Sequence, residues 1–530
     1  MTCRVMILGG TGNFGCCVAR MLADDPAITL LLASRSETRA RAAAVGLAAA
    51  NSPEPLCVDI RADPAPAIKS ARPDVVIHAV GPFQDQDYRV AEAAIAAGAH
   101  YLDLADARDF VAGIGRLDSK AKAAGVAVIA GASSVPCLTA AFIDHYRPRF
   151  AHLSSVEYGI SAAQATNRGL GTASAILSYV GKPFTRMEKG QSYRVFGWQG
   201  LTAVRYPELG LRLFGDCDVP DLSLFPERYP GLQRLRFVAG HEIKLLHLGT
   251  WLLSWAVRLR LVRSLEPHAD ALLRASFLFD PVGSNRSGFH IKIEGTGRDG
   301  APMLVEGFMV ARQGHGPHIP CLPAALLAKR IAAGEIPSAG ARPCLDLIDL
   351  DQYLTALVPL DITTTAKGSG IDDAWPKGDG MTHSTELRRD TPLFVFDGMC
   401  VLCSTGANFI MRHDREGRVQ FASAQSDLGR AIYKRMGLPI DSSYLLLDPD
   451  GTHAKTDGYF QLARILGGWY RLGLVFRIIP RPIRDWFYDR VAKNRYRWFG
   501  KAEYCCLLRP EQRERLVESD EGLSEQLMAG

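Results

Sequence analysis

The chain of 530 residues lacks a long uncharged apolar run. No stretch reaches the roughly 20 apolar residues that a membrane-spanning helix needs, so we expect no transmembrane segment. A signal peptide is also missing, because the chain enters an apolar, strand-like run at residues 5–8 almost at once. We therefore expect a cytoplasmic location, in which the twelve cysteines remain mostly free thiols.

Strongly charged blocks are absent too. The 61 Lys and Arg residues nearly balance the 56 Asp and Glu residues, which leaves a net charge of +5. Because there is no basic block, we expect no nucleic-acid partner. We also expect no metal site, since His315 and His318, separated by Gly-Pro, fit a loop better than a zinc site. Without a nucleophile elbow or zinc-ligand spacing in residues 132–360, redox chemistry there would depend on a cofactor.

A glycine-rich motif near the N-terminus is the first positive signal. It follows a predicted strand, opens a predicted helix, and consists of Gly9, Gly10, Thr11, Gly12, Asn13, Phe14 and Gly15. In this context Gly10 permits the tight turn, Gly12 lets the backbone approach a phosphate, and Gly15 lets the helix pack on the strand. The helix N-terminus adds free N–H groups and the positive end of a dipole. The motif therefore predicts a dinucleotide site.

The end of the second predicted strand lacks the Asp or Glu that binds the ribose hydroxyls of NAD. Ser34 and Arg35 stand there instead, and a guanidinium binds a 2′-phosphate through charge-assisted hydrogen bonds. We therefore predict NADP(H) over NAD(H), and we interpret Arg39 and Arg41 as a solvated helix face. Gly81 and Pro82 end another strand, where the backbone either approaches the cofactor or simply turns.

Candidate proton donors for a hydride transfer are Tyr101, Asp103 and Asp106, which lie near a predicted strand end, and Tyr158. For each of them a structural role competes with the catalytic one. Residues 247–263 are strongly apolar, with three arginines near their end. They fit peripheral membrane contact or a lipid substrate, although a buried helix with outward-pointing arginines would explain them as well.

Periodicity divides the chain into domains. Residues 1–131 alternate strands with helices, one of them predicted at 110–124, and the strands are apolar on both faces. This predicts an α/β fold with a Rossmann-like, doubly wound parallel sheet. Residues 132–360 predict an α+β substrate domain with paired strands at 289–294 and 303–305. The composition then predicts a linker at 361–390, a further domain at 391–510, and a tail at 511–530.

The second redox motif places two cysteines at the start of a predicted helix. Asp397, Cys400 and Cys403 follow a short apolar strand. A helix N-terminus stabilises a thiolate, so Cys400 is the expected attacking sulfur and Cys403 the resolving one. Zinc is the main rival for such a pair, but the chain offers no well-spaced second pair. Asp397 is expected either to relay a proton or to cap the turn.

Residues 9–15, 33–35, 79–83 and 97–103, with later motifs at 316–320 and 340–344, resemble the saccharopine dehydrogenase-like oxidoreductase family over about residues 1–360. The resemblance implies a Rossmann-like NADP-binding domain and a second domain that binds substrate and mediates homodimer contacts. Members include lysine-pathway enzymes and a trans-acting enoyl reductase of lipid synthesis, so the implied substrate is a small or lipid-like molecule.

The motif of Asp397, Cys400 and Cys403, with residues 424–426, 456–458, 479–485 and 494–500, resembles the DCC thiol-disulfide oxidoreductase family. This resemblance implies a thioredoxin-like fold and a protein dithiol as partner. The sequence thus predicts a multidomain fusion: an NADP(H)-dependent oxidoreductase joined to a thiol-disulfide module. The alternative is an NADP(H)-sensing regulatory or scaffold protein in which only the dithiol domain reacts.

Overall fold

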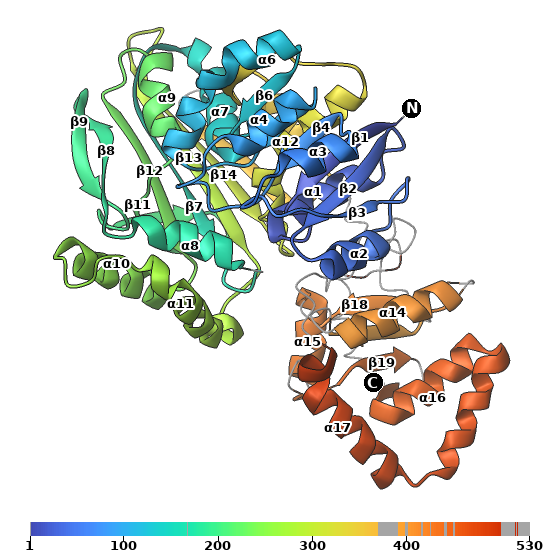
Figure 1. The fold of residues 1–530 in the computed structure, drawn as a ribbon. Helices are drawn as coiled ribbons and strands as arrows, with labels where there is room; N and C mark the ends of the chain where they lie inside the picture. Colours follow the sequence, from blue (N-terminus) through green and yellow to red (C-terminus); the bar gives the residue numbers. More distant parts are fainter. Residues whose placement is uncertain are drawn as a thin grey trace. The chain divides into compact units, whose positions relative to one another are not determined.

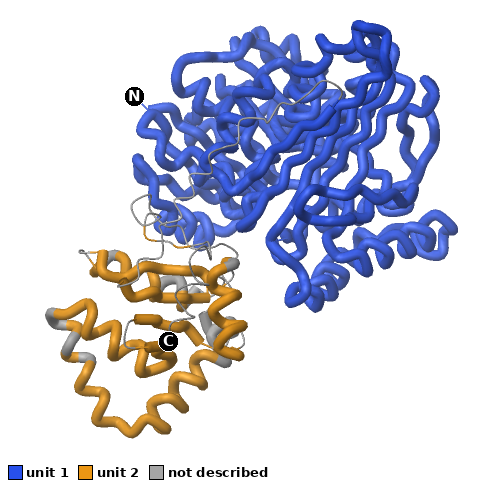
Figure 2. The backbone as a smooth tube through the Cα atoms, turned by 180° about the vertical axis from the view of Figure 1, so that it is seen from behind, with its two compact units in different colours: residues 1–380 blue, residues 381–530 orange. Residues whose placement is uncertain are grey.

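The computed structural model describes residues 2–166, 168–368, 391–397, 401–414, 417–424, 426–438, 443–448 and 451–499, together with 515 and 517. The chain folds into two compact units, unit 1 with residues 1–380 and unit 2 with residues 381–530 (Figure 2). Within the described ranges, no helix is both long and apolar enough to cross a membrane.

The first sheet of unit 1 is parallel throughout, with the strand order β15-β6-β5-β4-β1-β2-β3 (Figure 1). Its strands are β1 (Cys3–Leu8), β2 (Ile28–Ser34), β3 (Glu54–Cys57), β4 (Val75–His78), β5 (His100–Asp103), β6 (Ala127–Ala130) and β15 (Gly340–Pro343). The central β1 is buried on both faces, from Val5 to Leu8, because helices cover both sides of the sheet. This confirms the predicted Rossmann-like sheet.

One face of the sheet shares an apolar core with four helices: α3 (Ala65–Ala71), α4 (Arg89–Ala96), α5 (Arg108–Ala112) and α6 (Asp118–Ala124). On the other face α1 (Asn13–Ala23) packs against α12 (His318–Ala332), and α2 (Glu37–Gly46) follows β2 (Figure 1). The single helix predicted at 110–124 is wrong. A 3-10 turn at Gly113–Leu117 separates α5 from α6. The two glycines in this turn have a low propensity for the interior of an α-helix, which explains the interruption.

The chain returns to the first sheet after it has built the second one. α12 lies on α1, and β15 extends the first sheet by pairing with β6. The predicted division between residues 1–131 and 132–360 therefore does not separate two independent domains. The sequence could not show this, because the pairing joins residues more than 200 positions apart.

The second sheet of unit 1 is mostly antiparallel, in the order β10-β11-β12-β7-β13-β14-β16, with β8 and β9 as a side hairpin. Its strands are β7 (Phe150–Ala162), β8 (Pro183–Glu188), β9 (Gln191–Phe196), β10 (Thr202–Tyr206), β11 (Gly210–Asp216), β12 (Arg234–His241), β13 (Ser287–Gly297), β14 (Pro302–Ala311) and β16 (Ile362–Gly368). The pairing of β13 with β14 confirms the predicted hairpin. The start of the predicted linker at 361 is wrong, because β16 pairs with β14.

Six further helices belong to this part of unit 1: α7 (Thr139–Tyr146), α8 (Leu170–Tyr179), α9 (Asp221–Arg228), α10 (Lys244–Arg258), α11 (Ala269–Ser276) and α13 (Leu350–Leu357). The helix α13 begins with a capping box. The carboxylate of Asp349 accepts the N–H of Gln352 at 2.7 Å, and the Gln352 side chain accepts the N–H of Asp349.

Unit 2 contains a four-stranded sheet in the order β18-β17-β19-β20. Its elements are β17 (Leu393–Phe396), α14 (Val401–His413), β18 (Gln420–Ser423), α15 (Asp427–Arg435), β19 (Leu445–Asp448), β20 (Gly451–Ala454), α16 (Lys455–Leu466), a 3-10 helix η6 (Gly468–Ile478) and α17 (Arg481–Phe499). β17 and β18 are parallel, whereas β19 and β20 are antiparallel to their neighbours. A parallel β-α-β unit followed by an antiparallel pair is the thioredoxin-like arrangement.

Part of the predicted C-terminal tail takes part in the fold of unit 2. The N–H of Phe421 donates to the carbonyl of Arg515 at 2.8 Å, and the N–H of Val517 donates to the carbonyl of Phe421 at 2.8 Å. Val517 is buried in the same apolar cluster as Leu428. Arg515 and Val517 therefore lie along the edge of β18, although residues 511–530 were predicted to form a tail.

Candidate functional site

The loop between β1 and α1 contains the predicted glycine motif. Gly9 has a φ of +79°, a left-handed conformation that glycine adopts without strain. A Cβ atom on Gly15 would lie 2.1 Å from the carbonyl oxygen of Gly9, so α1 approaches this loop only because residue 15 has no side chain. Gly10 is also confined, since a Cβ there would lie 3.1 Å from the carbonyl oxygen of Ile7.

Gly12 differs from these glycines because it borders open space. It is the N-cap residue of α1, and among the described residues a Cβ on it would meet only the Gly9 carbonyl oxygen within 4 Å, at 3.2 Å. Asn13, Phe14 and Gly15 form the first turn of α1. The N–H groups of a first turn have no partners within the helix, and the dipole end is positive. The geometry therefore fits a bound phosphate.

The end of β2 lies beside this loop. Thr11 Oγ1 donates to Ser34 Oγ at 3.1 Å, which links the loop to the strand end. Arg35 is exposed, and within the described structure it forms no ion pair. Arg41, in contrast, pairs with Glu37 at 2.6 Å along α2. Of these two arginines, Arg35 has its guanidinium available for a ligand.

The turn after β4 lies on the other side of the glycine loop. Gly81 is exposed and is joined to Pro82 by a cis peptide bond. A Cβ on Gly171, in the first turn of α8, would lie 3.4 Å from the carbonyl oxygen of Gly81. A Cβ on Gly169 would lie 3.4 Å from Nδ2 of Asn13. The ends of β1 and β4 and the start of α8 therefore meet around the glycine loop.

Three of the four candidate proton donors are fully buried. Tyr101 Oη lies 3.0 Å from Nδ1 of His78, and burial lowers the pKa of His78 to about 3. One carboxylate oxygen of Asp103 accepts two backbone N–H bonds, at 3.0 and 2.7 Å, and burial raises the pKa of Asp103 to about 7. Tyr158 lies in the core. These three side chains stabilise the fold and have no access to a substrate.

Asp106 is the candidate that solvent reaches. It follows β5 at the carboxyl edge of the sheet, next to the turn that contains Gly81. Although the residue is exposed, many protein atoms surround its carboxyl and raise its pKa above the usual value, while a hydrogen bond with the Gln84 side chain opposes the rise. Asp106 is therefore a carboxyl group that holds its proton to higher pH than an ordinary aspartate.

Sequence reasoning missed two side-chain pairs beside Asp106. Tyr179 ends α8, and its hydroxyl lies 3.1 Å from Sγ of Cys217. Burial raises the pKa of both groups, and the charge of Asp106 raises them further. Arg108 pairs with Asp218, whose pKa burial raises to about 6. No motif or spacing marks these residues, because the pairs join segments far apart in the chain.

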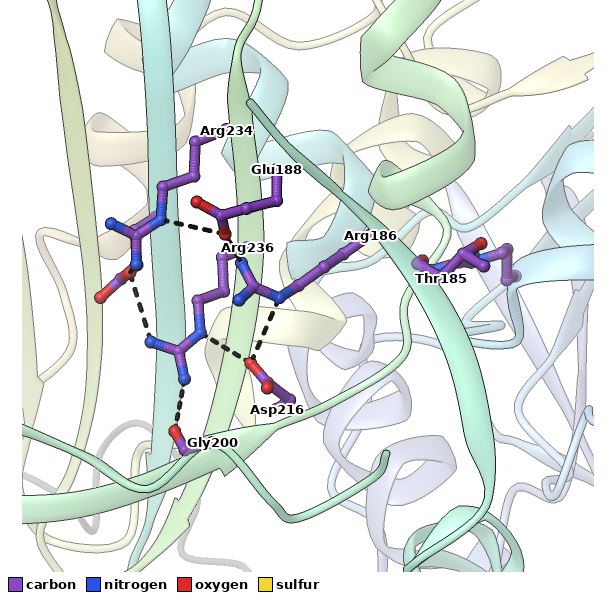
Figure 3. A network of polar contacts seen from close by, with 9 residues as sticks. Thr185, Arg186, Glu188, Gly200, Asp216, Arg234 and Arg236 are labelled. Carbon is purple, nitrogen blue, oxygen red and sulfur yellow. Dashed lines mark hydrogen bonds and ion pairs between the residues drawn. The ribbon is translucent and has the colours of Figure 1, made fainter. Parts of the chain in front are cut away.

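A buried ion network fixes the strand end that presents Cys217 and Asp218 (Figure 3). Arg236 Nε donates to Asp216 Oδ1 at 2.6 Å, and Arg186 Nε lies 3.8 Å from the same oxygen. Arg236 also donates to the carbonyl of Gly200 at 2.5 Å. Because buried charges are costly unless they are paired, this network holds β11, β12 and the β8–β9 hairpin in one arrangement.

The predicted dithiol is only partly described. Cys400 lies outside the described residues. Asp397 is buried directly after β17, and the half-buried Cys403 lies in the first turn of α14. The helix begins at Val401. Among the described residues, no group of three His, Cys, Asp or Glu side chains is arranged to hold a metal ion.

Residues 247–263 form most of α10 and the turn after it. Leu245, Leu252 and Leu259 are exposed along the outer side of this segment. His247 and Ser254 are buried on its inner side, where Trp198 stacks on His241 and lies at a tilt to His247. α10 is therefore half-buried, with leucines rather than polar residues on much of its exposed side.

Each unit contains a region that matches a known family. The saccharopine dehydrogenase NADP binding domain family matches residues 5–129, and the DCC1-like thiol-disulfide oxidoreductase family matches residues 394–501. A DCC family protein of Arabidopsis thaliana chloroplasts is 32% identical over 117 residues, 22% of this chain and 68% of the relative. The chain belongs to the DCC family. The uncharacterized protein YuxK of Bacillus subtilis is 36% identical to the DCC region over 127 residues, 24% of this chain and 93% of the relative.

Solved structures resemble the chain over part of its length. The apo saccharopine dehydrogenase (L-Glu forming) of Saccharomyces cerevisiae is 13% identical and covers 69% of this chain and 99% of its own, with a TM-score of 0.47. The homospermidine synthase of Legionella pneumophila in complex with NAD is 10% identical and covers 71% and 94%, with a TM-score of 0.44. The chain is thus a DCC family member with an additional saccharopine dehydrogenase-like dinucleotide-binding domain.

Proposed function

We propose that unit 1 is an NADP(H)-dependent oxidoreductase that reduces a C=C, C=O or C=N bond of a small or lipid-like substrate. The observation that supports this most directly is the exposed Gly12 at the N-terminus of α1, in a loop whose Thr11 bonds to Ser34, the residue before Arg35. Gly9, Gly10 and Gly15 have the packing of a dinucleotide loop, whereas Gly12 leaves room for a phosphate.

The residues around the loop fit the parts of NADP(H) in order. The first turn of α1 would hold the pyrophosphate, and Ser34 and Arg35 at the end of β2 would hold the 2′-phosphate. The nicotinamide would then lie toward β4 and β5, near Gly81 and Pro82, since ligands bind across the carboxyl ends of the strands. When bound, the reduced nicotinamide supplies the hydride.

Asp106 is the residue that we assign to proton delivery. Its raised pKa keeps a larger fraction of the carboxyl protonated near neutral pH than in a free aspartate. It lies at the end of β5, the strand adjacent to β4, so its proton is available on the side where the nicotinamide is expected. Solvent can then reprotonate the exposed carboxyl.

In unit 2, the reduced Cys400 and Cys403 would exchange with the disulfide form of a protein dithiol partner, which would leave as two thiols while Cys400 and Cys403 form the disulfide. The attacking thiolate would come from Cys400, and Cys403 would resolve the mixed disulfide. The start of α14 at Val401, directly after residue 400 in the chain, supports Cys400 as the attacking sulfur, because a helix N-terminus favours the thiolate of a nearby cysteine. The burial of Asp397 next to the motif is consistent with a proton relay.

The exposed leucines of α10 support the lipid-like substrate class and peripheral membrane contact through residues 247–263. Leu245, Leu252 and Leu259 form an apolar side that a lipid could cover, and Arg258 and Arg260 lie close to it in the chain. The competing function is NADP(H) sensing without chemistry in unit 1. The accessible carboxyl of Asp106 favours the enzyme, since a sensor needs no proton donor.

Titration of the full-length protein with NADPH and NADH tests the proposal, with Arg35→Glu and the matched variant Arg41→Glu. A charge-assisted contact contributes about 1.5–3 kcal/mol, so Arg35→Glu should weaken NADPH binding by about tenfold or more. NADH binding should change little, and Arg41→Glu should leave the affinity for both dinucleotides near that of the wild type. Unchanged NADPH affinity in Arg35→Glu would exclude the assigned 2′-phosphate site.

A further inference from the structure

Unit 2 exposes a run of large apolar side chains that extends from η6 into the first turns of α17. It includes Leu472, Val475, Phe476, Ile478, Ile479, Ile483, Trp486 and Phe487, whose exposed fractions run from 39% for Ile479 to 81% for Ile478. We name residues 472–487 the apolar hairpin. Single exposed apolar residues are common on soluble proteins, but a contiguous group of this kind marks a binding surface.

Positive charge accompanies the apolar hairpin. Arg477 is exposed in the middle of it, and Arg490 is exposed one turn beyond it; neither forms an ion pair within the described structure. The carboxylates nearby are already paired: Asp485 with Arg481 at 3.5 Å, Asp489 with Lys455 at 2.8 Å, and Asp457 with Arg484 at 2.9 Å. The surface therefore combines exposed apolar side chains with the positive charges of Arg477 and Arg490.

We propose that the apolar hairpin docks on a membrane surface that contains anionic lipids. Aliphatic and aromatic side chains would enter the boundary between headgroups and acyl chains, and Arg477 and Arg490 would contact the phosphate groups. Trp486 has the amphipathic ring that is enriched at this depth of a bilayer. The proposal does not depend on the activity of unit 1.

Charge argues against the other occupants of this surface. A second copy of the hairpin would bring the unpaired Arg477 of both copies together, and like charges across an interface are unfavourable. The exposed leucines of α10 lie close in the chain to Arg258 and Arg260, so like charges also disfavour that segment as a partner. A nucleic acid would satisfy the arginines but would leave Ile478, Ile479 and Val475 without apolar contact.

Vesicle co-sedimentation of the full-length protein tests the proposal, with vesicles of phosphatidylcholine alone and of phosphatidylcholine with phosphatidylglycerol. Binding is expected to the anionic vesicles and to weaken as salt is added. The double variant Phe476→Glu/Ile478→Glu should weaken binding by about tenfold or more, and Arg477→Gln by about fivefold. All these side chains are exposed, so the variants should fold.

Two matched variants separate this surface from others. Met436→Glu alters an apolar residue after α15 that is also exposed, and it should bind vesicles like the wild type. Leu252→Glu alters the α10 surface of unit 1. The proposal is overturned if the hairpin variants bind as well as the wild type, if Leu252→Glu alone abolishes binding, or if the hairpin variants change only self-association or retention on single-stranded DNA.

Discussion

Replacing Gly15 with alanine tests whether the tight packing of the dinucleotide loop is needed for binding its ligand. In Gly15→Ala the new Cβ would lie 2.1 Å from the Gly9 carbonyl oxygen and 2.7 Å from the Gly9 carbonyl carbon. Both atoms are backbone, so neither can rotate away as a flexible side chain would. The helix α1 must move outward or the loop must open, and either change displaces the N–H groups that would bind phosphate.

The expected loss of stability in Gly15→Ala follows from the size of this overlap. Inserting a methyl group into a packed core costs about 1–3 kcal/mol, and a clash with fixed backbone belongs at the upper end. Against a typical stability of about 5–15 kcal/mol, the variant should still fold but should melt earlier. Because α1 also contacts α12, the displacement should spread into that helix.

Gly12→Ala and Gly46→Ala are the matched comparisons for this prediction. A Cβ on Gly12 meets only a carbonyl oxygen at 3.2 Å, so this variant should keep most of its stability yet lose NADPH affinity, since the methyl group enters the phosphate space. A Cβ on Gly46 meets nothing within 4 Å, so that variant should change neither property. Differential scanning fluorimetry with and without NADPH measures both. If Gly15→Ala matched the wild type in melting and in its NADPH-induced shift, the packing argument would be refuted.

Three further predictions address the proton donor, a buried carboxyl and the independence of the two units. Asp106→Asn should lower NADPH-dependent turnover by about 100-fold while leaving NADPH affinity unchanged, which would identify a proton-transfer role by single-turnover kinetics. Burial raises the pKa of Asp221 to about 7, so the folded state retains a proton that the unfolded chain loses above about pH 4. The free energy of unfolding should therefore fall between pH 4 and 7 by about 1.4 kcal/mol per pH unit because of this carboxyl. Asp221→Asn should flatten that slope in denaturation curves collected at several pH values, and an unchanged slope would contradict the raised pKa of Asp221. Cys403→Ser should abolish thiol–disulfide exchange without altering NADPH turnover, whereas a parallel loss of both activities would show that the two units are coupled.

Local patterns were sufficient to predict the first sheet and its glycine loop. Strands that alternate with helices and are apolar on both faces predict a parallel sheet, and the structure confirms that sheet, with β1, β2, β4, β5 and β6 among its strands. β3 was not predicted because it contains Pro55, and a proline usually interrupts a strand. Proline is tolerated there because β3 lies at the edge of the sheet.

Features that depend on distant pairing could not be predicted. β16 is rich in threonine, lysine and glycine, so its composition resembles a linker, and only its partner β14 makes it a strand. The return of α12 and β15 to the first sheet has no local signature. The contact between Tyr179 and Cys217 likewise depends on tertiary packing, although Asp106 next to it was among the predicted candidates.

Hydrogen–deuterium exchange of the full-length protein, with and without NADPH, tests the central claim most directly. The account predicts slower exchange in peptides that contain residues 9–16 and 33–36 when NADPH is present, with weaker protection of residues 33–36 by NADH. Protection confined to other segments, or exchange that NADPH does not change anywhere in unit 1, would contradict the assignment of a dinucleotide site to the loop between β1 and α1.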